Sequence, residues 1–204
     1  LEIVVDDEER NITRFNSVIA ALESVTPRIE IATGGRCSFL TRGPSRYFGG
    51  DQALGQIVAD RASEALSAMI DVKQIPTAIQ PRIGIADSRF AASLAAVSQD
   101  TSCVQIVPPT ASRDFLAPFS VRSLTDGDSP LAEADDFVDI LQRLGLGTLG
   151  DVASLPREEL YARFGTEGLL AHRLSRGMDG RTPVLQPVSD VAFGEREIDP
   201  PADH

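Results

Sequence analysis

The chain has 204 residues, and 42% of them are apolar, which permits a packed core and argues against global disorder. Its net charge of −11 argues against nucleic-acid binding over the whole surface. No apolar run reaches the roughly 20 residues that a membrane span needs, and the acidic first residues lack the basic start of a signal peptide. The chain opens without Met in a strand-like run, so we expect a piece of a longer protein.

The charge is unevenly distributed along the chain. Residues 31–94 carry a net charge of +2 and residues 141–182 carry +1. Residues 1–30, 95–140 and 183–204 carry −4, −6 and −4. Because phosphates are repelled by acidic surfaces, we expect any contact with a polyanion in one of the two basic blocks.

The first third of the chain predicts helix, hairpin and helix. Apolar residues at steps of three and four predict a helix that includes residues 12–22 and ends near Pro27. Strands are predicted over 28–32 and 37–40, with a turn between them. A loop over residues 42–50 is expected next, and Asp51 is a plausible N-cap for a long helix with apolar residues from Leu54 to Met69.

A second strand-helix-strand unit follows. Residues 82–86 predict a strand, Asp87 or Ser88 caps a helix through Val97, and residues 104–107 predict a strand that Pro108 stops. The uneven alternation predicts an α+β fold, with a mostly antiparallel sheet and helices on one of its faces.

The composition changes after residue 124. Residues 125–136 hold five acids, Gly127 and Pro130, which predicts an exposed connection. Residues 137–182 show helical periodicity with short glycine-containing turns, and residues 183–204 are rich in Pro and acid. We therefore expect an α+β domain over 1–124, the connection, a small all-α domain over 137–182, and a linker or tail over 183–204.

The small helical domain carries the most specific pattern. Gly-containing turns at Gly145 and Gly147, followed by Thr148, would direct backbone N–H groups outward, where they can hold a phosphate. An ordinary helical hairpin, in which the glycines only terminate helices, explains the same residues.

The order of motifs resembles the thumb of Y-family DNA polymerases. Residues 144–156 match that family's Leu-Gly-Ile-x-Thr-x-Gly-Asp-Leu and Leu-Pro stretches, and Phe-Gly at 164–165 and Arg-Gly-Met-Asp at 176–179 follow at matching spacing. The resemblance implies a helix-hairpin-helix-like thumb and extends over nearly the whole chain.

The first half resembles the palm of the same family. By strand order Thr33 takes the place of the family's Ser, and Gly35 and Arg36 take the places of its metal-binding Asp and Glu. Residues 83–95 match the family's Val-Gly-Ile-Ser-x-Asn-Lys stretch, with Arg89 at the first Lys as a remnant of nucleotide-phosphate binding and Ser93 at the second.

The departures from the family pattern imply an inactive branch. Glycine has no side chain to offer a metal, and Arg36 brings a positive charge where the resemblance places two divalent ions. We expect no catalytic residue, no metal and no cofactor, with magnesium required only if unrecognised acids restore a polymerase. Residues 42–50 are similar to a loop of the ImuB-type branch, which acts as a non-catalytic partner in damage-induced translesion synthesis.

That resemblance implies the setting of the protein. Its partners would be an active error-prone polymerase, a RecA-like accessory protein and the sliding clamp, in the bacterial cytoplasm and at the nucleoid when recruited. DNA contact is expected to be weak because acids at 126–136 replace the family's phosphate-binding hairpin. The remaining candidates lie in the thumb: Gly145, Gly147, Thr148, Arg173, Arg176 and Arg181. Solvated helix faces explain these arginines equally well.

Three functional hypotheses remain open. They are a catalytically silent polymerase-like scaffold in DNA damage tolerance, an active error-prone Y-family polymerase, and a generic DNA-binding module. The Gly35-Arg36 pair favours the scaffold. Cys37 and Cys103 are predicted to be buried reduced thiols, and His172 a surface or half-buried histidine.

Overall fold

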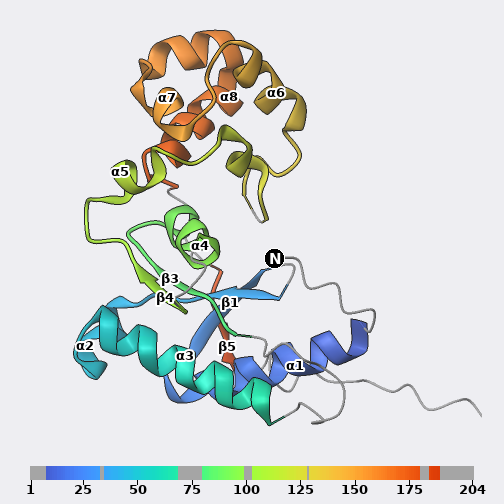
Figure 1. The fold of residues 1–204 in the computed structure, drawn as a ribbon, viewed down its shortest axis with the longest axis vertical. Helices are drawn as coiled ribbons and strands as arrows, with labels where there is room; N and C mark the ends of the chain where they lie inside the picture. Colours follow the sequence, from blue (N-terminus) through green and yellow to red (C-terminus); the bar gives the residue numbers. More distant parts are fainter. Residues whose placement is uncertain are drawn as a thin grey trace, which may run out of the picture.

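The computed structural model describes residues 8–32, 35–68, 80–98, 103–127, 129–179 and 184–188, with side chains from Arg14 onward. Its elements, in chain order, are α1 (Glu8–Ala21), η1 (Leu22–Ser24), β1 (Arg28–Ala32), β2 (Arg36–Ser38), α2 (Arg42–Phe48), α3 (Asp51–Ser67), β3 (Ile83–Ile85), α4 (Arg89–Val97), β4 (Val104–Ile106), α5 (Ser112–Leu116), η2 (Val121–Thr125), α6 (Asp135–Arg143), α7 (Leu149–Ser154), α8 (Arg157–Ser175) and β5 (Gln186–Pro187). Figure 1 shows α6, α7 and α8 gathered at one end and α1, α2 and α3 at the other.

A three-stranded antiparallel sheet carries the predicted hairpin. β1 lies in its centre, between β2 and β5. The register pairs Glu30 with Ser38 and Ala32 with Arg36. β5 pairs Ile29 with Gln186, so part of the predicted 183–204 linker adds a strand to this sheet.

A separate parallel pair, β3 and β4, lies between α3 and α4 (Figure 1). Glycine allows both helices to approach closely. A Cβ on Gly55 of α3 would lie 2.5 Å from Val104 Cγ1, and a Cβ on Gly84 of β3 would lie 2.0 Å from the Ala92 carbonyl oxygen of α4. The α+β class is confirmed, and the parallel pair with helices on both faces adds to the antiparallel sheet that the sequence predicts.

The described residues form two hydrophobic core clusters. One lies under the antiparallel sheet and contains Ile19, Leu22, Val25, Ile29, Leu54, Val58 and Val188. The other joins α4 to the helices of residues 112–175 and includes Phe90, Leu94, Leu116, Val121, Leu141, Leu149 and Leu174. Because α4 packs on β3 and also enters the second cluster, it connects the two ends of the molecule.

The helices of residues 135–175 follow the predicted pattern, and α8 also contains a break. α7 begins at the N-cap Thr148 with a capping box to Asp151. α8 is interrupted at Gly165, whose φ of 59° and ψ of −135° are not helical. The predicted cap Ser88 is confirmed, since its hydroxyl accepts a hydrogen bond from the Ala91 amide.

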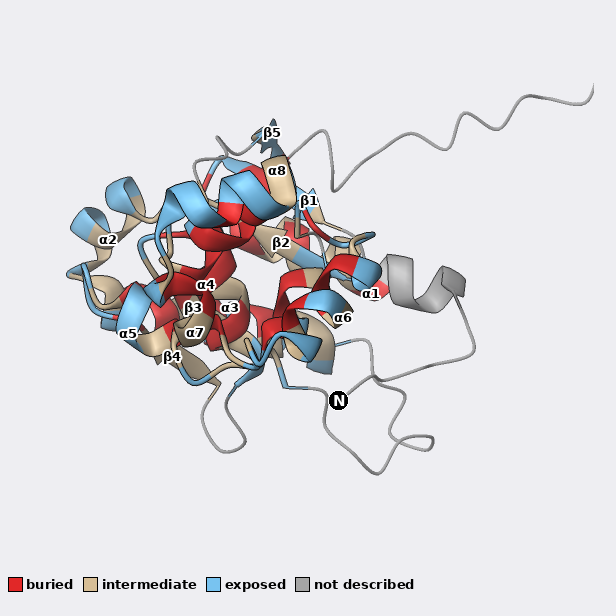
Figure 2. Cartoon of the chain, turned by 90° about the horizontal axis from the view of Figure 1, so that it is seen from above, coloured by how far each residue is buried: buried red, intermediate tan, exposed pale blue. Residues whose placement is uncertain are grey.

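Three sequence-based expectations are wrong. Residues 42–48 form α2 and not a loop, because Phe48 packs on the core cluster and the Ser45 hydroxyl donates to Asp51. The N-cap of α3 is Gly50, and Asp51 is its first residue. Within the acidic connection, Leu131 is buried in the second cluster, so that segment is not exposed throughout. Figure 2 shows α2 without buried residues, in contrast to α4.

Candidate functional site

The hairpin of β1 and β2 presents two different faces. Side chains alternate along a strand, so Ile29 and Cys37 point toward the core cluster, whereas Glu30, Arg36 and Ser38 share the opposite face. Gly35 precedes β2 with a φ of +70°, a backbone conformation that favours glycine. Thr33, which the resemblance aligns with the family's Ser, lies outside the described residues.

The buried acid of this face is Glu30, which is 4% exposed. Its Oε1 atom lies 3.4 Å from Arg89 Nη1, and its Oε2 atom accepts a 3.5 Å hydrogen bond from the Ser38 hydroxyl. The sequence predicts Arg89 as a remnant of phosphate binding, and the structure directs its guanidinium toward Glu30. Both carboxylate oxygens of Glu30 are therefore engaged by side chains of the chain itself.

Backbone amides at the N-terminus of α4 also have side chains of the chain itself as their hydrogen-bond partners. The Ser88 hydroxyl accepts from the Ala91 amide at 3.1 Å, and Asp179 Oδ2 accepts from the Phe90 amide at 2.9 Å. A helix N-terminus attracts anions, and here the carboxylate of Asp179, four residues after the end of α8, supplies the charge. We did not single out Asp179 from the sequence, although it ends the Arg-Gly-Met-Asp string that carries the resemblance.

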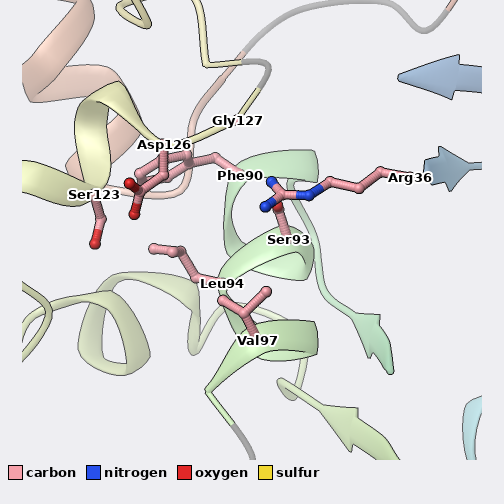
Figure 3. Close-up of a pocket in the computed structure, with 8 residues that line it drawn as sticks. All are labelled: Arg36, Phe90, Ser93, Leu94, Val97, Ser123, Asp126 and Gly127. Carbon is pink, nitrogen blue, oxygen red and sulfur yellow. The ribbon is translucent and has the colours of Figure 1, made fainter. Parts of the chain in front are cut away.

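Arg36 reaches from β2 into a cavity of about 280 Å³ between the hairpin, α4 and the residues that follow η2. Phe90, Leu94 and Val97 provide its apolar side. Figure 3 shows the Arg36 guanidinium above Ser93, on the side of the cavity where Gly127 lies. The side chain of Arg36 therefore lies beside the hairpin, in the cavity next to α4.

In the predicted thumb loop, to which the sequence assigns phosphate binding, backbone amides donate to carbonyl oxygens of the chain itself. The amides of Gly145 and Leu146 donate to the carbonyls of Gln142 and Leu141, and the amides of Leu149 and Gly150 donate to those of Phe119 and Ala117. These bonds close the end of α6 and attach the loop to the segment after α5.

The donors that lie between those pairs, on Gly147 and Thr148, face the carboxylate of Asp151. Asp151 Oδ2 accepts from the Thr148 amide and hydroxyl, both at 2.8 Å. The Thr148 hydroxyl, the Thr148 amide and the Gly147 amide hold the pKa of Asp151 below its ordinary value. Its spacing of three residues after a Thr N-cap is a sequence signal for this arrangement.

The structure describes two of the three arginines predicted for the thumb, and they differ in exposure. Arg173 is exposed, and its Nε atom donates to the Met178 carbonyl oxygen at 3.3 Å. Arg176 is half-buried at the end of α8. Arg181 lies outside the described residues.

His172 is buried at 6% exposure, so the expected surface or half-buried position is wrong. Burial lowers the pKa of His172, and the positive charges of Arg176, Arg157 and Arg113 lower it further. The thiol of Cys37 is also shielded, and burial raises its pKa to about 11. Cys37 and Cys103 are both unbonded and half-buried.

Within the part of the chain that the structure describes, no group of three or more His, Cys, Asp or Glu side chains could hold a metal ion. In the same described part, no helix is both long and apolar enough to cross a membrane.

Proteins similar to the chain in sequence include three that are each a DNA polymerase IV. The one from Shewanella oneidensis is 30% identical over 105 residues, which cover 52% of this chain and 28% of that protein. The one from Desulfatibacillum aliphaticivorans is 33% identical over 115 residues, with 56% and 27% covered. The one from Methanoculleus marisnigri is 29% identical over 147 residues, with 69% and 39% covered.

The chain is similar to part of a Y-family DNA polymerase. It spans well under half of the length of these relatives. No protein-family model matches the chain, and no solved structure matches it.

Proposed function

We propose that the protein is a non-catalytic Y-family polymerase-like scaffold in DNA damage tolerance. The observation that carries the proposal is the pair Gly35 and Arg36 at the turn into β2, where the resemblance expects a metal-binding Asp and Glu. Nucleotidyl transfer in polymerases uses two divalent ions about 4 Å apart, which position both the attacking and the leaving oxygen. Glycine supplies no ligand for such ions, and a guanidinium repels them.

The neighbouring acid supports the same proposal. Glu30 is the buried carboxylate on the hairpin face that carries Arg36, and its two oxygens already face Arg89 and Ser38. A carboxylate engaged in this way is a poor replacement for a metal ligand, because an incoming ion would have to displace a positively charged neighbour.

The proposal extends to the organisation and setting of the protein. We propose a palm-like part over 1–124, a connection over 125–136, a thumb over 137–182 and a linker that begins at 183. The partners proposed from the ImuB-type resemblance are an active error-prone polymerase, a RecA-like accessory protein and the sliding clamp, in translesion synthesis and induced mutagenesis in the bacterial cytoplasm. The DNA contact proposed for the thumb is weak, since Asp151 already receives the Gly147 and Thr148 donors.

Primer extension with magnesium or manganese tests the proposal, beside a Gly35→Asp/Arg36→Glu variant. A Cβ on Gly35 meets no atom within 4 Å, and Asp tolerates a positive φ better than most residues, so this variant has room to fold. A Gly43→Asp/Arg42→Glu variant makes the same charge change on exposed α2 and serves as the control.

We expect no extension by the natural protein or by the control. Extension gained only by the Gly35→Asp/Arg36→Glu variant would show that the carboxylates alone are missing. Extension by contaminant-free natural protein would overturn the scaffold proposal.

A second candidate is an active Y-family polymerase with metal ligands outside the described residues. The observation that favours it is that all three relatives are DNA polymerases IV. This candidate predicts magnesium-dependent extension by the natural protein, so the same assay separates the two functions.

A further inference from the structure

Arg36 makes a contact that the loss of a metal site does not explain. Its guanidinium lies directly against the backbone of Gly127. A Cβ on Gly127 would lie 2.1 Å from Arg36 Nη1 and 3.1 Å from Arg36 Cζ. A side chain at position 127 would require the Arg36 guanidinium to move, and the φ of Gly127, +60°, is also one that favours glycine.

The contact joins two segments that are separated by 91 positions in the sequence and belong to different layers of the molecule. Arg36 begins β2, whose neighbour Cys37 packs on the cluster under the antiparallel sheet. Gly127 follows η2, whose residues Val121 and Leu124 lie in the cluster of the helical end. Among the described residues, no residue belongs to both clusters, so a side chain that crosses between these two segments adds a contact beside the packing of α4.

The space around the contact explains why a long side chain is needed. A cavity of about 280 Å³ separates the hairpin from η2, with Ser93 and Val97 of α4 along its floor (Figure 3). Arginine combines a long aliphatic stem, which can cover apolar surface, with a flat guanidinium that packs well on exposed backbone. Asp126 also lines the cavity, beside Ser123 and Gly127.

We propose that Arg36 is a strut that braces the palm hairpin against the connection to the thumb at Gly127. The residue would thus have acquired a structural role at a position where the resemblance expects a metal ligand. The strut fixes the orientation of the helical end relative to the hairpin, and it partly closes the side of the hairpin that faces α4. The inference does not depend on the proposed function, because an active enzyme and a scaffold could both use such a brace.

A double-mutant cycle of Arg36→Ala and Gly127→Ala tests the strut through the melting temperature of the protein. In the natural background the added methyl group at Gly127 meets the guanidinium and also suffers the positive φ. In the Arg36→Ala background only the backbone strain remains. We therefore expect Gly127→Ala to lower the melting temperature by about 2–4 °C more in the natural background than in the Arg36→Ala background.

Equal effects of Gly127→Ala in the two backgrounds would overturn the strut. Amide hydrogen exchange gives a second measurement, for use if Gly127→Ala fails to fold. Arg36→Ala is expected to speed exchange in residues 121–127, because the connection loses its brace. Arg42→Ala removes an exposed arginine from α2 and is expected to leave that exchange unchanged. Unchanged exchange in Arg36→Ala would also overturn the proposal.

Discussion

At the scale of single residues, carboxylates of the chain itself meet the groups that the sequence assigns to phosphate binding. Glu30 faces Arg89, and Asp151 accepts from Thr148. Outside the predicted set, Asp179 accepts from the first turn of α4 in the same way. A bound phosphate would have to displace each acid and leave its negative charge nearby, which costs electrostatic energy. These positions are thus better suited to holding the fold together than to gripping DNA.

The capping box of α7 gives a prediction at this scale. Removing the Asp151 side chain by Asp151→Ala is expected to destabilise the protein by about 0.5–2 kcal/mol, since the Thr148 amide and hydroxyl lose their acceptor. Chemical denaturation near neutral pH measures this loss. Glu133→Ala, at an exposed acid of the connection, is the control and is expected to change stability little.

The stability that is lost in Asp151→Ala is expected to depend on pH. The pKa of Asp151 is lower in the folded protein than the ordinary value of 3.8, so the unfolded chain takes up the proton first as the pH falls. The contribution of the carboxylate is therefore fully present above the ordinary pKa and is lost as the pH falls through the lowered one. The stability difference between natural protein and Asp151→Ala should shrink in acid, and a difference that grows there would contradict this assignment.

At the scale of elements, local patterns predict most helices and long-range contacts decide the exceptions. The apolar steps of α1, α3 and α4 are visible in the sequence. α2 contains Gly43 and Pro44, which locally indicate a turn, and its helix depends on Phe48 packing into a distant core. β5 has two residues and exists only through its pairing with β1, so no local periodicity could reveal it.

The same reasoning applies to the candidate site. The resemblance placed Gly35 and Arg36 at the hairpin, and the capping-box spacing could have indicated Asp151. Glu30 and Arg89 are 59 positions apart, and Arg36 meets Gly127 only after folding. Pairings of this kind depend on how α4 sits across the hairpin, which a single sequence does not specify.

The break in α8 gives a prediction at the scale of elements. Gly165 has a φ of 59° and a ψ of −135°, a combination that residues with a Cβ adopt only under strain. Gly165→Ala is therefore expected to destabilise the protein by about 1–3 kcal/mol, although a Cβ there meets no atom within 4 Å. Gly43→Ala is the matched control, because Gly43 also has open space and lies in a helix without a positive φ.

Thermal or chemical denaturation of both variants separates backbone strain from steric clash. The control is expected to be neutral or slightly stabilising, since alanine is the better helix former. Equal stability of Gly165→Ala and the natural protein would mean that α8 can straighten through residue 165 at no cost.

At the scale of the whole molecule, α4 links the two ends because it packs on β3 and also enters the helical core cluster. Asp179 strengthens this link by joining the end of α8 to the start of α4. The helical end is therefore held to the hairpin end by packing, by a hydrogen bond and, in our proposal, by Arg36.

The net charge of −11 sets the last prediction, which concerns DNA. A strongly acidic protein repels the DNA backbone, so binding to duplex DNA should be weak and should fall steeply as salt is added. Arg173 and Arg176 are the arginines among the predicted contacts that the structure describes. Arg173→Ala/Arg176→Ala is expected to weaken binding and to reduce the slope of log affinity against log salt by about 2, one unit for each lost phosphate contact.

Fluorescence anisotropy with a labelled duplex over a range of salt concentrations measures that slope. Arg42→Ala/Arg46→Ala on α2 removes the same charge from exposed positions outside the predicted thumb and controls for the change in net charge. If both pairs weaken binding equally, the arginines act only through net charge and the thumb holds no phosphate contact. If only the α2 pair matters, DNA meets the other end of the molecule, and the thumb assignment is wrong. A loss of affinity confined to Arg173→Ala/Arg176→Ala would instead mean that the end of α8 contacts the DNA backbone despite the acids around it. Both double variants change the net charge equally, so net charge alone could not produce such a difference.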